Sequence, residues 1–132
     1  MKGIILSICL FIFSCAGITP LNSNDWEKHY SSDFLVVVKK VIQLRSEGEW
    51  DNAISHLMSQ DDENYSSTER AFRRNLIGVH YLKNTSFEKA VMHFEQALSY
   101  EIEDNVLVST LNLNLANSLF QLGLFERSLE SL

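Results

Sequence analysis

The chain of 132 residues has little proline, glycine and cysteine, and no excess of basic residues. Its one proline, Pro20, lies near the N-terminus and only five glycines are present, so few residues interrupt helices later in the chain. Basic residues number 11 against 17 acidic ones, for a net charge of −6, which gives no support to nucleic-acid binding. Both cysteines, Cys9 and Cys15, fall in the N-terminal segment, so no disulfide is expected in the rest of the chain.

The N-terminal segment has the features of a secretory signal. A positive start at Lys2 precedes an apolar run from Gly3 to Phe13, and small residues follow at positions 14–17. Spanning a bilayer takes about twenty apolar residues, so this run is short for a membrane helix. Residues 1–14 are therefore predicted to be a signal peptide, with an uncleaved membrane anchor as the alternative.

The end of this segment, residues 12–15, reads Ile-Phe-Ser-Cys and resembles a bacterial lipobox. In that pattern an aliphatic residue and two mostly small residues precede a cysteine that is acylated and becomes the new N-terminus. Phe13 is bulkier than the pattern usually has, and Cys9 fits less well because Ile8 precedes it. The resemblance implies a lipoprotein anchored through Cys15, with residues 15–32 as a tether. Ordinary secretion without a lipid is the alternative.

The residue after the cysteine bears on location within the cell envelope. Ala16 stands where an aspartate retains lipoproteins at the inner membrane in some bacteria. The resemblance therefore implies an exported, lipid-anchored protein, at the outer rather than the inner membrane, on its periplasmic or surface face.

The rest of the chain is self-similar. Residues 48–57, 85–94 and 123–132 each contain a turn, an aromatic residue, a small residue three places later and a large apolar residue four places after that. The small residues Ala53 and Ala90 are 37 positions apart, and Ala90 and Ser128 are 38 apart. A fixed period of this length indicates repeated supersecondary units.

Each of these stretches follows a segment with a helical pattern. The segments are residues 33–45, 66–83 and 105–122. In the second, Ser66 and Glu69 have capping-box spacing, and Gly123 is suited to end the third. Three consecutive valines at 36–38 favour a strand in the first segment, but the repeat predicts a helix there.

The small and large residues of these units resemble the tetratricopeptide repeat, in which two antiparallel helices pack closely. The resemblance implies an all-α solenoid of about three helix pairs over residues 33–132, divided as 33–62, 66–100 and 105–132, the last possibly truncated. Val41 stands where a small residue is expected. The implied packing residues are Trp50, Ala53, Gly78, Tyr81, Phe87, Ala90, Phe94, Ala97, Ala116, Phe125 and Ser128. The alternative is a helical bundle whose spacing agrees by chance.

The period exceeds the usual repeat of about 34 residues by three or four. The surplus is expected after each second helix, as one more turn or a longer loop. Ile102 stands where the family has its helix-ending proline, which favours a longer second helix.

The resemblance also implies a concave face, lined by the first helix of each pair, that binds a peptide. Asparagine amides there can donate to and accept from an extended backbone. The paired basic residues by which some members clamp a terminal carboxylate are missing. The candidate peptide-binding residues are Asn75, Val79, Leu82, Lys83, Leu113, Asn114, Asn117, Phe120 and Gln121. The alternative is that these amides are ordinary surface residues.

No catalytic constellation is recognisable: a phosphate-cradling glycine loop, an HExxH pair and a nucleophile elbow are all missing from the sequence. His56 and His93 occupy equivalent places in two repeats, which indicates a shared structural role rather than metal binding. We therefore expect a non-enzymatic protein without metal or cofactor.

The expected function is a membrane-tethered scaffold or adaptor that binds a protein or peptide in the cell envelope. The last helix would leave Leu124, Phe125, Leu129 and Leu132 partly uncovered. The sequence is thus expected to be the N-terminal part of a longer protein, an enzyme or a scaffold, or to dock a partner at this edge. A self-associating assembly factor is the third possibility.

Overall fold

The computed structural model describes residues 27–132, apart from the side chain of Phe125. The expected signal peptide, Cys15 and most of the tether lie outside the described residues. The described part is all-helical and contains no strand. Its elements are the 3-10 helix η1 (Glu27–His29) and the α-helices α2 (Ser32–Ser46), α3 (Trp50–Met58), α4 (Ser67–Lys83), α5 (Phe87–Leu98), α6 (Asn105–Gln121) and α7 (Phe125–Glu130).

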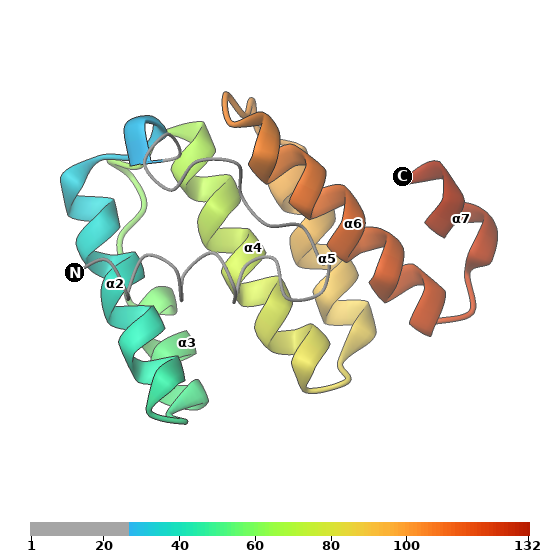
Figure 1. Cartoon of the computed structure of the whole chain (residues 1–132), viewed down its shortest axis with the longest axis horizontal. Coiled ribbons are helices and arrows are strands. Elements are labelled where there is room, and N and C mark those ends of the chain that lie inside the picture. Colours follow the sequence, from blue (N-terminus) through green and yellow to red (C-terminus); the bar gives the residue numbers. More distant parts are fainter. Residues whose placement is uncertain (1–26) are drawn as a thin grey trace.

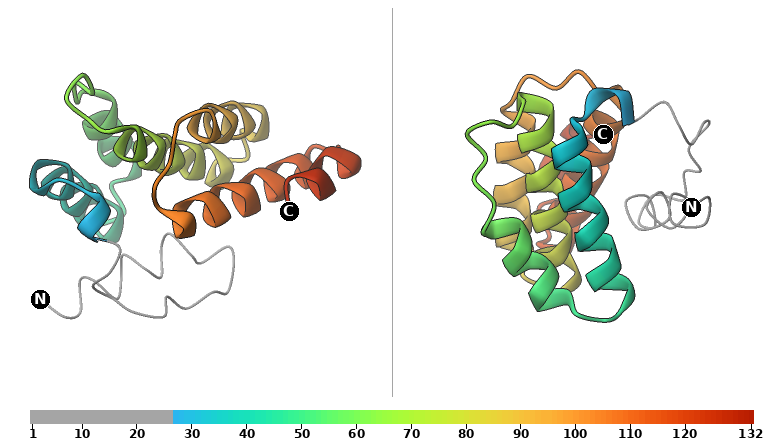
Figure 2. Two further views of the ribbon diagram at one scale, coloured as in Figure 1. Left: turned by 90° about the horizontal axis from the view of Figure 1, so that it is seen from above. Right: turned by 90° about the vertical axis from the view of Figure 1, so that its left-hand side faces the viewer.

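The helices form three consecutive hairpins, α2/α3, α4/α5 and α6/α7 (Figure 1). Each helix packs against the next one in the chain, and α6 also contacts α4. The first and last hairpins lie at opposite ends of the molecule, as the views in Figure 2 show. Between residues 27 and 132, none of the helices is both long enough and apolar enough to span a membrane.

The three hairpin turns have the same backbone geometry. The residues at the turn, Gly48, Thr85 and Gly123, all have positive φ angles, of 81°, 58° and 75°. In the first turn Gly48 N–H donates to Arg45 O and Glu49 N–H donates to Leu44 O, the bonding pattern of a Schellman motif. The same two bonds recur 37 and 75 positions later in the chain. The period seen in the sequence is therefore also a period of the backbone.

The expected first helices are confirmed to within one residue at each end, as α2, α4 and α6. The capping box is present: the Ser66 side chain accepts from Glu69 N–H, and the Glu69 carboxylate accepts from Ser66 N–H. The valine run at 36–38 is helical because Phe34, Val38 and Val41 recur at helical spacing and are fully buried. Burial on one face outweighs the strand preference of isolated valines.

Small residues let the helices of each hairpin approach closely. Ala53, Ala90 and Ser128 are all buried at equivalent positions of α3, α5 and α7. Gly78 of α4 faces the ring of Phe94, and an added Cβ would lie only 2.5–2.9 Å from three of its carbons. Of the other residues expected to pack, Ala97 and Ala116 are buried, whereas Trp50, Tyr81 and Phe87 are partly exposed.

Two boundaries differ from the sequence-based expectation. The second helices are not lengthened: α3 ends at Met58 and α5 at Leu98, so the surplus residues form the connections 59–66 and 99–104. Ile102 lies in the second connection rather than in a helix. The folded body also begins before Asp33, because η1 is helical and Tyr30 is buried. Residues 27–32 therefore belong to the body and not to the tether.

Candidate interaction surfaces

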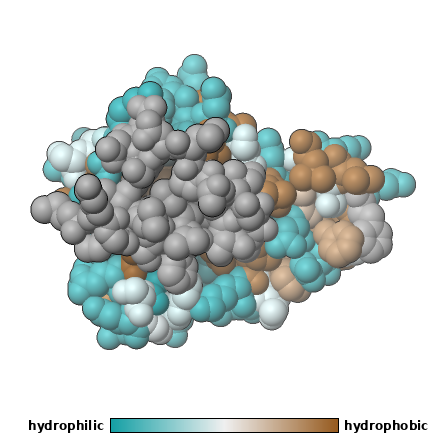
Figure 3. All heavy atoms as spheres, viewed as in Figure 1, coloured by the Kyte–Doolittle hydropathy of each residue, from teal (hydrophilic) through white to brown (hydrophobic). Residues whose placement is uncertain are grey.

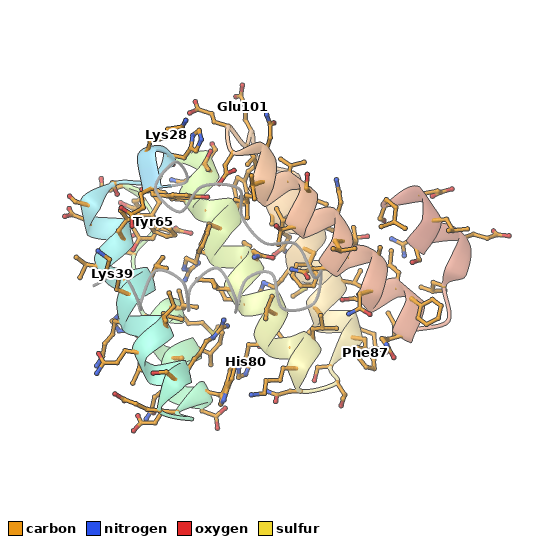
Figure 4. All side chains as sticks on the ribbon, in the orientation of Figure 1. Lys28, Lys39, Tyr65, His80, Phe87 and Glu101 are labelled. Carbon is orange, nitrogen blue, oxygen red and sulfur yellow. The ribbon has the colours of Figure 1, made fainter. Side chains whose placement is uncertain are left out.

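An aromatic cluster fixes α2 to α4 at one end of the molecule. The ring of Phe34 lies 5.7 Å from Tyr30, 5.7 Å from Phe72 and 5.1 Å from Tyr65, which Figure 4 labels beside α2. Two of these contacts are edge-on, the arrangement that aromatic quadrupoles favour. Burial raises the pKa of Tyr65, with smaller contributions from the carboxylates of Glu69 and Asp62, and together these outweigh the opposing effect of Arg73. This cluster belongs to the hydrophobic core and offers no exposed site.

Polar groups at the same end connect the start of the body to the later hairpins. The Tyr30 hydroxyl donates to Asp104 Oδ2 at 2.7 Å, and Ser31 N–H donates to Glu69 Oε1 at 2.6 Å. In Figure 4 Lys28 and Glu101 lie at this end as well. Burial and the neighbouring Asp104 carboxylate raise the pKa of Tyr30. The segment that would emerge from the tether is thus held against both α4 and α6.

The Glu69 carboxylate is shared between two helix starts. One oxygen accepts from Ser31 N–H, before α2, and the other accepts from Ser66 N–H, before α4. Burial alone would raise the pKa of Glu69, but the hydrogen bonds from Ser31 and Ser66 outweigh burial and hold this pKa below its usual value. The carboxylate is therefore stabilised in its charged form.

Two of the residues expected to bind a peptide are buried against each other. Asn75 is 0% exposed and Asn114 is 2% exposed. The Asn114 Nδ2 donates to Asn75 Oδ1 at 3.0 Å, whereas Asn75 Nδ2 is buried without a hydrogen-bond partner. These amides join α4 to α6 and are not presented at the surface. The expectation that both pair with a peptide backbone is therefore not met in this structure.

The other candidate peptide-binding residues remain at least partly accessible. Lys83 is exposed, and its Nζ lies 3.1 Å from the centre of the Trp50 ring, so it is held across the end of the first hairpin. Gln121 and Phe120 are exposed at the end of α6. The partly exposed members of the set are Val79, Leu82, Leu113 and Asn117.

A buried cation beside Trp50 was not expected from the sequence. Arg45 is 5% exposed, its Nη2 donates to Leu76 O at 2.8 Å, and its Cζ lies 5.2 Å from the Trp50 ring centre. Burial lowers the pKa of Arg45 to about 10. The one signal in the sequence was spacing, because Arg45 falls on the same helical face as the buried Val38 and Val41. The contact fastens the end of α2 to α4.

The two equivalent histidines have different surroundings. His93 is buried, stacks on Tyr81 with ring centres 5.4 Å apart, and lies 3.3 Å from Arg74 Nη1 through its Nδ1. Burial and then Arg74 and Arg73 lower the pKa of His93 to about 4. His56 is only partly buried. Within residues 27–132 no three His, Cys, Asp or Glu side chains are grouped so as to hold a metal ion.

The last hairpin carries an exposed apolar edge. Helix α7 is fixed to the body by Ser128 Oγ, which donates to Ala116 O at 2.7 Å, and by an ion pair between Arg127 and Glu95 at 2.5 Å. Leu129 of α7 is 73% exposed, and Phe120 at the end of α6 is 57% exposed. Figure 3 shows hydrophobic side chains gathered at the end of the molecule that carries α7. This edge is a second candidate surface, besides the accessible peptide-binding candidates of α4 and α6.

Comparison of the chain with protein-family models, with curated proteins and with solved structures finds no match.

Proposed function

We propose that this chain is a non-enzymatic interaction module of tetratricopeptide-like repeats, tethered to a membrane in the cell envelope, that holds a protein or peptide. The observation that carries the proposal is the repetition itself. Three hairpins share one turn geometry and one set of buried small residues at spacings of 37 and 38. Stacked helix pairs of this kind form extended surfaces, which such proteins use for binding.

The proposed binding surface is the set of accessible residues on the first helices. Leu113 and Asn117 of α6 lie on the helix that carries the exposed Gln121, and Val79 and Leu82 are partly exposed on α4. Apolar side chains beside amides suit an extended peptide, since the amides can satisfy its backbone groups. Of the amides expected to bind a peptide, Asn117 and Gln121 remain accessible, whereas Asn75 and Asn114 are buried and hydrogen-bonded to each other.

The proposed tether is a lipid on Cys15. Support comes from the lipobox-like sequence at residues 12–15 and from the signal-like segment before it. A single acyl chain holds a protein only marginally at a membrane, so stable anchoring calls for more than one chain. The outer membrane is the proposed location, on the ground that Ala16 follows the cysteine.

A second candidate is a self-associating assembly factor, favoured by the exposed Leu129 and Phe120 at the last hairpin. Self-association predicts that the apparent molecular mass in solution rises with protein concentration. The two candidates differ in the surface used, so variants at Leu113 of α6 and at Leu129 of α7 separate them.

The tether is tested by the intact mass of the mature protein from a detergent extract, beside a Cys15→Ala variant. The expected mass is that of a chain beginning at Cys15 and carrying at least a diacylglycerol, lost in the variant. An unmodified chain cut after the signal would remove the membrane from the proposal and leave a secreted module.

The binding surface is tested by photo-crosslinking in intact cells, with a photoreactive residue at Leu113 or Gln121 and a control at Lys39 on α2. We expect one discrete adduct from α6, which a Leu82→Asp change in the same chain suppresses, and none from Lys39. Adducts that form equally from all three positions, or not at all, would contradict the proposed surface.

A further inference from the structure

One repeat position is covered in the first two hairpins and open in the third. The equivalent residues on the second helices are Ile54, Val91 and Leu129, at spacings of 37 and 38. Ile54 packs partly buried against the core and Val91 is 8% exposed, whereas Leu129 is 73% exposed. On the first helices the equivalent residues are Arg45, which is 5% exposed, Leu82, which is partly exposed, and Phe120, which is 57% exposed. The third hairpin therefore presents more of this surface than either of the other two.

In the earlier hairpins this surface is covered by the first helix of the next hairpin. Helix α4 covers the first hairpin: Arg45 donates to Leu76 O, and Arg73 of α4 donates to Leu57 O at 3.0 Å, at the end of α3. Helix α6 packs in the same way on α5 and also contacts α4. The molecule thus contains two examples of what covers this edge, and both are α-helices; α4, the one that covers the first hairpin, carries Arg70, Arg73, Arg74 and Lys83 beside its buried residues.

Helix α2, at the opposite end of the molecule, lacks the kind of residues with which α4 covers the first hairpin. In α4, Arg73 contacts the first hairpin through Leu57 O, and Ile77 and His80 follow it at helical spacing; all three are buried. Their equivalents in α2 are Val36, Lys40 and Gln43, all exposed. A second copy stacked head to tail would therefore have to bury Lys40 and Gln43 against Leu129, which is costly without partners for these groups.

The charges beside the open edge also favour a different molecule over a second copy. Arg127 is engaged with Glu95, and the other charged residues of α7, Glu126 and Glu130, are exposed. Two copies paired edge to edge would bring these carboxylates together, whereas a helix with basic residues beside its apolar stripe would complement them.

We propose that the edge formed by Phe120, Leu129 and the acidic side chains of α7 binds an amphipathic, basic α-helix of a partner protein, laid along it as α4 lies along the first hairpin. The inference rests on the proposed function of an interaction module and adds a surface and a class of partner. It adjoins the peptide surface at Phe120, at the end of α6, and differs from it by the residues of α7.

A suitable probe is a labelled synthetic peptide of residues 66–83, the sequence of α4 with its cap. It carries four basic residues and one acidic residue, and it is the helix that covers the equivalent edge of the first hairpin. Binding to the full chain in detergent is measured by fluorescence anisotropy. We expect saturable one-to-one binding that weakens as salt is raised.

Variants on α7 test whether the peptide binds at this edge. Leu129→Asp is expected to weaken binding about tenfold or more, because it replaces an apolar contact with a charge. Glu126→Lys with Glu130→Lys is expected to weaken binding and to flatten its salt dependence. Val36→Asp, on an equally exposed valine of α2, is the matched control and should change nothing. Circular dichroism confirms that each variant remains folded, and the charge reversal tests the edge without touching an apolar residue.

Other outcomes overturn the inference in distinguishable ways. If the peptide binds as well to Leu129→Asp and to the double charge reversal as to the wild type, its binding site lies elsewhere. A mass that doubles with concentration and returns to that of a monomer in Leu129→Asp would make a second copy the occupant. Loss of peptide binding in a natural chain extended past Leu132 would make the occupant part of the same chain. An unbound peptide, beside retained crosslinks from Leu113 and Gln121, would remove this inference and leave the proposed function standing.

Discussion

The two carboxylate oxygens of Asp104 are bonded to different parts of the chain, and one of them accepts from the hydroxyl of Tyr30, 74 positions earlier. The other oxygen caps α6 by accepting from Val106 N–H at 2.9 Å and Leu107 N–H at 3.2 Å. One side chain therefore both starts the last long helix and holds the beginning of the folded body. Through Tyr30 the start of the folded body is connected directly to the residue that caps α6 in the third hairpin.

Tyr30→Phe tests this coupling. The ring contacts with Phe34 and Phe72 are retained, but the buried Asp104 oxygen loses its donor. We expect the free energy of unfolding to fall by about 1–3 kcal/mol, the cost of an unsatisfied buried polar group. Urea unfolding followed by circular dichroism measures it. Tyr100→Phe, at a partly exposed tyrosine, is the control, and an equal effect of both changes would show that the hydrogen bond does not matter.

Gly78→Ala tests the close approach of α4 and α5. The added methyl would overlap the ring of Phe94, which is fully buried. We expect a loss of about 1–3 kcal/mol from overpacking. Phe94→Leu alone should also destabilise, by leaving a cavity. If the methyl and the ring compete for one space, the double variant loses less than the two single losses added together. Additive losses would show that Gly78 is required for another reason.

The helices could be predicted from the sequence because their buried residues recur at helical spacing, as Phe34, Val38 and Val41 do. Even the valine run at 36–38 could be assigned to a helix, because the equivalent segments of the other two repeats have a helical pattern. The ends of α3 and α5 could not be predicted: both stop at a serine, Ser59 or Ser99, and the residues beyond contain neither glycine nor proline. No local signal marked those ends.

The surfaces were harder to predict than the helices. Asn75 and Asn114 were expected to meet a peptide because each lies on a first helix, but they are 39 positions apart, and their side chains meet across α4 and α6. Periodicity within one helix cannot reveal a pair of this kind, since it depends on how two hairpins are offset. The exposed Leu129, by contrast, was expected, because the final repeat of a solenoid leaves its apolar face uncovered.

Thr85→Gly should stabilise the protein. Thr85 has a φ of 58°, where a β-branched side chain is strained, and the equivalent residues of the other two turns are glycines. We expect a gain of about 1 kcal/mol, the strain relieved less the backbone entropy that glycine adds. The reverse change, Gly48→Thr, meets no atom within 4 Å of its Cβ, so its effect reports φ strain alone. It should lower the free energy of unfolding by about 1–2 kcal/mol. A melting temperature unchanged in both variants would show that the turns relax without cost.

His93 should make the protein less stable in mild acid. The pKa of His93 is lowered to about 4 in the folded state, against an ordinary value of 6.5. Between these values the unfolded chain binds the proton more readily than the folded one, so the free energy of unfolding falls as the pH drops from 6.5 towards 4. Above pH 6.5 His93 is neutral in both the folded and the unfolded state, so its full contribution to the free energy of unfolding is present.

His93→Gln is expected to flatten this pH dependence, because glutamine keeps an acceptor for Arg74 but cannot be protonated in this range. Burial also lowers the pKa of His80, so a smaller slope from that residue should remain. Urea unfolding at a series of pH values between about 4 and 7 measures the effect around the ordinary histidine pKa. A slope that is the same in wild type and His93→Gln would mean that the His93 ring is protonated equally in the folded and unfolded states, and the packing of His93 against Tyr81 and Arg74 would then not exclude the charged form.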